Sequence, residues 1–297
     1  MTGYSRRMPR TKKTQVALVT DSTASLTPEQ VKEHGITVVP LQVIVGGKSY
    51  DEGVDAEATP ALIAQALKDW VPVSTSRAAP ASMLEAYRAV AAAGATEIVS
   101  VHLSADMSAT YESALLAAKQ APVPVVLVDS RQVGLATGFA VLAAARAIES
   151  GAGAQDAAAA ARASAAGSTS LFYVDTLDYL RRGGRIGPAA ALLGTALAVK
   201  PLLQMVDGRI ANIEKVRTAG KALARLADLA AAAAGGQPVQ LAVAHLDSED
   251  RATQLADTLS SRLSDNLEGR EVTVSEVGAV IGAHTGPGLV GVVVAPA

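Results

Sequence analysis

Apolar residues in the first half of the chain form short runs, separated by longer segments of helical spacing. β-Branched residues dominate the runs, and each run is long enough for one strand. We expect strands at "QVALVT" (15–20), "ITVVPLQVIV" (36–45), "EIVSVHL" (97–103) and "VPVVLVD" (123–129). The segments between them predict helices over about 27–34, 59–70, 80–93, 110–119, 138–149 and 154–166. Alternating strands and helices favour a mainly parallel sheet with helices on both faces.

Local signals refine this part of the chain. Thr27 and Gln30 have the spacing of a capping box, and Pro28 suits the first turn of a helix. Pro40 predicts an edge or a bend within its strand. The segment "GGKSYDEG" (46–53) is typical of a turn.

The pattern changes after "SLFYV" (170–174). Residues 202–216 indicate two strands around Asp207-Gly208, a dipeptide favoured in hairpins. The remaining segments predict helices over about 218–233 and 248–264, and strands over 239–246, 271–277 and 288–296. We therefore expect an α/β protein of two domains: an N-terminal parallel-sheet domain (15–168) and a C-terminal α+β domain with a partly antiparallel sheet (169–297).

Composition narrows the function classes. The 297 residues include no Cys, which excludes disulfides, thiolate nucleophiles and zinc-ribbon sites. The net charge is -2, and five cations crowd residues 1–14. Such a segment suits nucleic acid or anionic lipid, but we expect a disordered leader there. No run of 18 apolar residues and no apolar signal segment occurs. We expect a cytoplasmic protein with no nucleic-acid partner and no stable membrane insertion.

Hydroxyl groups are concentrated in three segments that we expect to be loops. These are "DSTASLT" (21–27), "STSRAAP" (74–80) and "LSADMSATYESA" (103–114). Each follows a strand or enters a helix, so the three would meet at one end of the sheet and form a site for an anion. Ordinary helix capping is the alternative for each loop.

Two further segments carry candidate residues. "RRGGRIGP" (181–188) either presents guanidinium groups to a ligand or partner, or forms a solvated basic turn. "IGAHTGPGLVG" (281–291) reads as a glycine-rich loop that carries His284. Enzyme motifs are absent: there is no HExxH, GxSxG or Walker A sequence, and no GxGxxG after a strand. A small Ser/His hydrolase acting on acyl esters, with Ser108 or Ser104 and His284, stays open as an alternative.

Taken in order, several of these segments resemble the DegV family of fatty-acid-binding proteins over residues 15–295. The segments are "VTDSTASL", "TSRAAP", "MSATYESA", "VDSRQVGLATG", "LDYLRRGGRIG", "LAVKPLL", "IEKVRT" and "IGAHTGPG". The resemblance implies a two-domain protein that holds one fatty acid, such as palmitate, between its domains. It places the carboxylate on Thr75 and Ser108, with His284 close by. Arg185 and Arg217 correspond to family arginines that suit packing or docking of a partner.

The resemblance also implies a role. Family members present the acyl chain to a fatty-acid kinase, which forms an acyl phosphate for phospholipid metabolism; the binding protein is then a carrier without catalytic residues, metal or nucleotide. Ser76, Ser104, Arg185 and Arg217 are secondary candidates for the head site. Arg77-Ala78-Ala79 replaces the usual Gln-Pro-Ser, and Met107 and Ala109 replace Leu and Gly. An interaction module whose cavity only fills space is a third interpretation.

Overall fold

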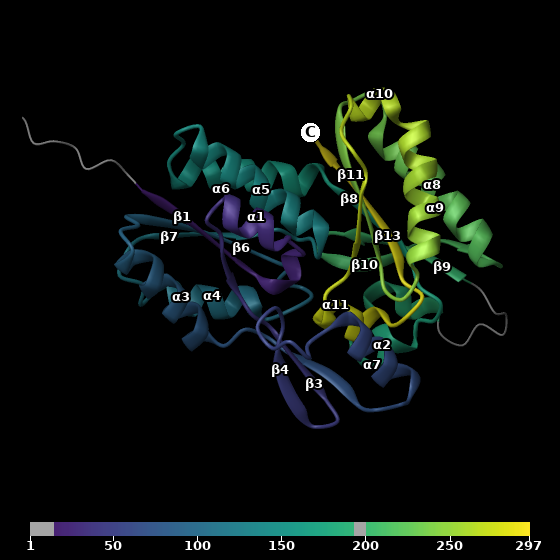
Figure 1. Ribbon diagram of the computed structural model, residues 1–297, viewed down its shortest axis with the longest axis horizontal. Coiled ribbons are helices and arrows are strands. Elements are labelled where there is room, and N and C mark those ends of the chain that lie inside the picture. Colours follow the sequence, from purple (N-terminus) through teal and green to yellow (C-terminus); the bar gives the residue numbers. More distant parts are fainter. Residues whose placement is uncertain (1–14, 193–199) are drawn as a thin grey trace, which may run out of the picture.

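The computed structural model describes residues 15–192 and 200–297. The expected leader, residues 1–14, lies outside this range. The described chain forms three sheets, and helices cover two of them (Figure 1). Among the described residues, no helix combines the length and apolar composition that a membrane crossing needs.

The first sheet is entirely parallel, as predicted. Its strands are β1 (Val16–Asp21), β2 (Thr37–Val39), β6 (Glu97–His102) and β7 (Val125–Asp129), in the order β2-β1-β6-β7. Helices α3 (Pro80–Ala92) and α4 (Thr110–Ala118) pack on one face, and α5 (Leu135–Glu149) and α6 (Ala154–Gly167) pack on the other. The fully buried Ala157, Ala158 and Ala161 let α6 approach the sheet closely. The capping box that begins α1 (Pro28–Glu33) is also confirmed.

The predicted strand over 36–45 divides at Pro40, where a bend was expected. Its second part, β3 (Gln42–Val45), belongs to a separate antiparallel sheet with β4 (Lys48–Asp51) and β5 (Val73–Ser76). The turn predicted over 46–53 is therefore wrong for residues 48–51. Gly46 and Gly47, at φ 57° and 87°, make the reversal, and the polar strand that follows has no apolar alternation to reveal it. Helix α2 (Pro60–Lys68) follows β4.

The second large sheet has six strands and is mixed, as predicted for the C-terminal domain. The strand order is β10-β9-β8-β13-β11-β12, and only β11 and β12 are parallel neighbours. The strands are β8 (Thr169–Tyr173), β9 (Lys200–Val206), β10 (Arg209–Val216), β11 (Val239–His245), β12 (Thr273–Glu276) and β13 (Val290–Pro296). Asp207 and Gly208 both adopt positive φ in the predicted hairpin, as a type I′ turn requires.

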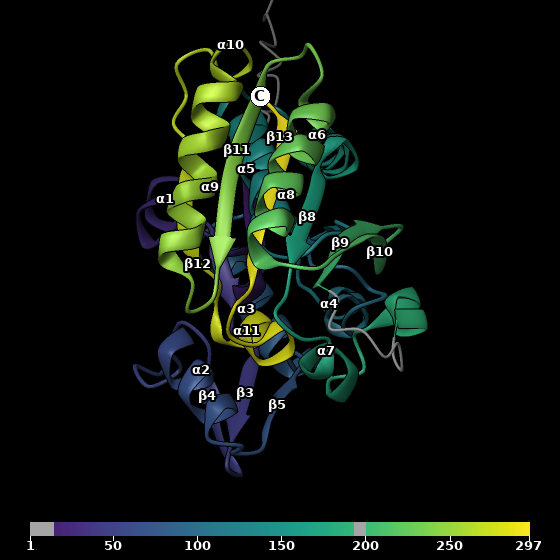
Figure 2. The same cartoon turned by 90° about the vertical axis from the view of Figure 1, so that its right-hand side faces the viewer.

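The two faces of this sheet have different neighbours (Figure 2). Helices α8 (Ala219–Ala234) and α9 (Glu249–Arg262), with the short α10 (Ser264–Leu267), cover one face. In β13, Val290, Val292 and Val294 pack under these helices, and Val293 and Ala295 pack with Ala136 of α5. The uncovered face is therefore turned toward the parallel-sheet half of the molecule.

Three short elements complete the junction: α7 (Asp178–Arg182), the 3-10 helix η2 (Gly187–Leu192) and α11 (Ala279–Thr285). The glycine-rich loop predicted over 281–291 is wrong for its first five residues, because they form the end of α11. All strands of the parallel sheet lie before residue 130 and all strands of the mixed sheet after residue 168. The domain boundary near 168 falls between them and stays a prediction.

Candidate functional site

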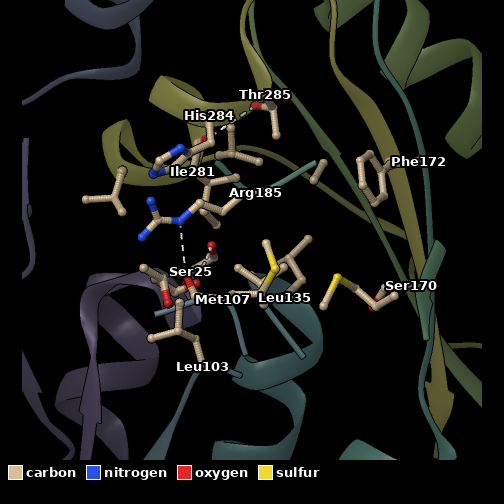
Figure 3. A pocket seen from close by; sticks show the side chains of 18 of the residues that line it. Ser25, Leu103, Met107, Leu135, Ser170, Phe172, Arg185, Ile281, His284 and Thr285 are labelled. Carbon is tan, nitrogen blue, oxygen red and sulfur yellow. Dashed lines mark hydrogen bonds between the residues drawn. The ribbon is translucent and has the colours of Figure 1, made fainter. Parts of the chain in front are cut away.

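A cavity of about 450 Å³ lies between the inner face of the six-stranded sheet, the loops after β1 and β6, β5 and α11. This volume is within the usual range for small-molecule sites. Figure 3 shows Phe172 and Ser170 at one side of the cavity, and His284 and Thr285 on α11 at another. The cavity therefore has walls of different chemistry.

The six-stranded sheet supplies an apolar wall. Phe172, Met205, Ala244 and Val293 line the cavity from four different strands. Gly291 lies among them, and a Cβ there would stand 3.2 Å from the Cβ of Phe172, so glycine leaves room beside the ring. Ser170 and Ser275 also line the cavity from this sheet, so the wall is mainly apolar and can hold an unbranched hydrocarbon.

His284 lies at the polar end and joins two elements that are far apart in the sequence. Its Nε2 is 2.8 Å from Oγ1 of Thr75 on β5. Its Nδ1 is buried, has no hydrogen-bond partner among the described residues, and faces Gly183, where a Cβ would stand only 2.1 Å away. Burial, with a smaller contribution from Arg185, lowers the pKa of His284 to about 4. The imidazole is therefore neutral at pH 7.

Arg185 brings a positive charge into the cavity. Its Nε donates to the carbonyl of Met107 at 3.1 Å, and its Nη1 donates to the carbonyl of Gly183 at 2.6 Å. The guanidinium lies between His284 on one side and Ser25 and Met107 on the other (Figure 3). Arg185 therefore lies at the candidate head site, and its bonds to two backbone carbonyls also hold the chain in place there.

The loops at the carboxyl ends of β1 and β6 provide the hydroxyl groups. Ser108 lines the cavity; its Oγ is 2.9 Å from Oγ1 of Thr110 and accepts the Thr110 N–H at 3.3 Å. Thr23 and Ser25 line it from the loop after β1. Two of the three predicted hydroxyl loops thus meet at one end of the parallel sheet, as expected. Thr75 is instead a strand residue, paired with Val43 of β3.

Comparison with known proteins identifies the family of this fold and cavity. A family model described as "Uncharacterised protein, DegV family" matches residues 15–297. The chain belongs to the DegV family. Among its DegV relatives, the DegV domain-containing protein SCO2569 of Streptomyces coelicolor is 55% identical over 280 residues, which cover 94% of this chain and 98% of the relative.

Solved DegV structures have the same fold. One is described as fatty acid binding of a DegV family protein from Thermus thermophilus; it matches with a TM-score of 0.87 and 32% identity, and covers 95% of this chain and 100% of that chain. DegV from Bacillus subtilis, described as a fatty acid binding protein, matches with a TM-score of 0.85 and 30% identity, over 96% and 100% of the two chains. The expected family and fold class are confirmed.

The remaining candidates of this DegV chain occupy different positions. Ser76 lines the cavity, and its Oγ donates to the Arg77 carbonyl at 3.4 Å; Arg77 also lines the cavity and is largely exposed. Ser104 is fully buried and donates to the Gly208 carbonyl at 2.7 Å, so it anchors the β9–β10 hairpin. Arg217 is exposed just after β10. Neither Ser104 nor Arg217 is among the described residues that line the cavity.

A Ser/His hydrolase needs a carboxylate that orients the histidine, and His284 has none among its described partners. A triad-like arrangement does occur elsewhere in the DegV core. His102 Nδ1 is 2.9 Å from Asp21 Oδ2, and His102 Nε2 is 2.7 Å from Ser100 Oγ. All three residues are completely buried, so no ester can reach Ser100. Asp21 also accepts the N–H groups of Thr23 and Leu103, which fixes the loops at the cavity.

The apolar wall and the cavity position of Ser25 could not be recognised from the amino-acid sequence. Ser25 belongs to a segment already marked for its hydroxyl groups, and its left-handed φ of 53° is visible only in the backbone. Phe172 and Val293 lie in continuous apolar runs, where periodicity gives no indication of which face meets a ligand.

Proposed function

We propose that this protein binds one long-chain fatty acid, such as palmitate, in the cavity between its two domains. One observation carries the proposal: a single cavity joins an apolar wall on the six-stranded sheet to a polar end formed by Thr75, Ser108, His284 and Arg185. The descriptions of the Thermus thermophilus and Bacillus subtilis neighbours as fatty-acid-binding proteins support the same ligand class.

The hydrocarbon tail supplies most of the affinity in this proposal. A 16-carbon acid has roughly 14 methylenes, and burial of each contributes about 0.8 kcal/mol, or about 11 kcal/mol before the entropic costs of binding. Hydrogen bonds to the carboxylate contribute about 1.5–3 kcal/mol each, reduced by the cost of desolvating the charge. The tail therefore sets affinity, and the polar end sets the direction in which the chain lies.

The carboxylate lies at Thr75 and Ser108 in this proposal, beside a neutral His284. With Thr75 and Ser108 alone, we would expect a carboxylate free of any fixed cation. Arg185 changes this expectation, because its guanidinium lines the same cavity. Its Nε and Nη1 already donate to the backbone carbonyls of Met107 and Gly183, so the carboxylate shares this cation with two dipoles.

A partner enzyme carries out the reaction of the bound fatty acid in this proposal. Here a fatty-acid kinase binds ATP and transfers its terminal phosphoryl group to the carboxylate, which gives the acyl phosphate and ADP. The protein is then a cytoplasmic carrier that presents the carboxylate, with Ser76 and the exposed Arg77 beside the head site. Arg217, exposed outside the cavity, is a candidate for contact with the kinase.

Native mass spectrometry followed by lipid extraction tests the binding proposal. The gently purified protein should carry one added mass that corresponds to a fatty acid, and a delipidated sample should regain it from palmitate. Delipidated protein that takes up no palmitate would refute fatty-acid binding. Addition of the kinase and ATP should then yield acyl phosphate, trapped as a hydroxamate, only when the loaded protein is present.

A further inference from the structure

Glu52 is a buried acid that the proposed binding site does not use. It follows β4 directly, and only 7% of the residue is exposed. Its Oε1 accepts the backbone N–H of Val280 at 2.8 Å, and its Oε2 is buried without a partner among the described residues. A half-satisfied buried carboxylate is costly, so its position calls for an explanation.

The backbone around Glu52 connects three parts of the cavity wall. The Glu52 N–H donates to the carbonyl of Leu41 at 2.9 Å, just before β3. The N–H of Leu41 donates in turn to Oγ of Ser22 at 3.0 Å, in the loop after β1. Since the Glu52 side chain reaches α11, this residue joins the three-stranded sheet, the β1 loop and α11.

These connections involve the same elements as the contact between Thr75 and His284. Val280 and His284 are four residues apart on α11, about one helical turn. Thr75 is fixed to the same three-stranded sheet as Glu52, through its pairing with Val43. The Glu52–Val280 hydrogen bond therefore joins the same two parts of the structure whose approach brings Thr75 within 2.8 Å of His284.

Gly278 makes the approach of Glu52 sterically possible. A Cβ at this position would stand 2.3 Å from Oε1 of Glu52, so any other residue would displace the carboxylate. The φ of Gly278 is -63°, which every residue can adopt, so the close approach and not the backbone conformation requires glycine here.

We propose that Glu52 is a positioning residue for the head site: it holds α11 against the three-stranded sheet so that His284 meets Thr75. Its effect on ligand affinity rests on the proposed fatty-acid function, whereas its effect on His284 does not. Packing of α11 against α2 and α7 is the competing account, and under it removal of the carboxylate would leave His284 in place.

The test compares Glu52→Ala, Glu52→Gln and Gly278→Ala in the full-length protein. The ring ¹⁵N shifts of His284, assigned with His284→Asn, report on its contact with Thr75 in the delipidated protein. We expect Glu52→Ala and Gly278→Ala to shift these signals and to weaken palmitate binding about tenfold. Glu52→Gln should preserve both properties, because its amide oxygen still accepts the Val280 N–H. Glu214→Ala, which removes an ion pair with Arg225, is the matched control and should change neither.

Unchanged His284 signals in Glu52→Ala would overturn the proposal. If Glu52→Ala does not fold, the other two variants test the proposal. Unshifted His284 signals in Gly278→Ala would count against the proposal, and so would shifted signals in Glu52→Gln. Failure of the wild-type protein to bind palmitate would refute the proposed function alone, since the His284 signals are read without ligand.

Discussion

Thr75→Val provides a direct test of the proposed head site. Valine has nearly the shape of threonine and the same preference for strands, so β5 should keep its pairing with β3. The substitution removes Oγ1, which lies 2.8 Å from His284 Nε2 and, in our proposal, also bonds the carboxylate. The change therefore removes a polar contact and leaves the apolar wall intact.

The expected magnitude follows from this loss. One hydrogen bond to a charged group contributes about 1.5–3 kcal/mol, so palmitate affinity should fall about 10- to 150-fold. The roughly 11 kcal/mol assigned to the tail should not change. Hexadecanol, which has the same chain and no charge, should lose much less affinity than palmitate in the variant.

Displacement of a fluorescent fatty acid from delipidated protein gives both affinities under one set of conditions. Thr75→Ser is the matched control, because it keeps the hydroxyl group and should bind palmitate within a few-fold of wild type. An equal loss for palmitate and hexadecanol would mean that the substitution damages the tail cavity. No loss for either ligand would show that Thr75 does not hold the head group.

Three further predictions concern stability. Gly183→Ala places a Cβ 2.1 Å from Nδ1 of His284, so it should destabilise the fold by about 1–3 kcal/mol in urea unfolding, whereas Gly220→Ala, which has open space, should not. Because the pKa of His284 is about 4 when folded and 6.5 otherwise, its unfolded form binds more protons between these values. Stability should therefore fall as pH drops from 6.5 toward 4, and less so in His284→Asn; equal pH profiles would contradict this. Asp21→Ala, which leaves buried donors unpaired, should cost about 3–5 kcal/mol. Glu268→Ala is the control, because it removes an exposed ion pair with Arg270 and should change stability by less than about 1 kcal/mol. Equal losses of stability in Asp21→Ala and Glu268→Ala would contradict the role given to Asp21.

The sequence predicted the large sheets well, because long regular patterns dominate them. The alternation of strand and helix segments predicted the parallel sheet, and Asp207-Gly208 predicted the hairpin between β9 and β10. The three-stranded sheet was missed because β4 is polar and only four residues long. Helix α11 was missed because it is short, contains Gly282 and ends at Gly286. From the sequence alone, glycines at this spacing indicate a loop.

The site was less accessible to sequence reasoning than the fold. Thr75 and His284 came from family motifs, and nothing in their spacing of 209 residues predicts a hydrogen bond between them. The cavity position of Arg185 could not be derived from its sequence, since a guanidinium beside paired glycines suits a solvated turn equally well. Its two bonds to backbone carbonyls depend on where α7 ends, which is a tertiary property.

Charge at the polar end limits which ligands the cavity can hold. His284 is neutral at pH 7 because burial lowers its pKa to about 4, so it supplies a hydrogen-bonding nitrogen and no charge. Among the described residues that line the cavity, the half-buried Arg185 and the exposed Arg77 are the two arginines. A carboxylate beside Arg185 is therefore paired with a half-buried guanidinium, whereas Arg77 at the exposed edge is screened by solvent and contributes less. The polar end therefore suits an anionic head group, and in the proposed function a fatty acid places its one negative charge beside Arg185.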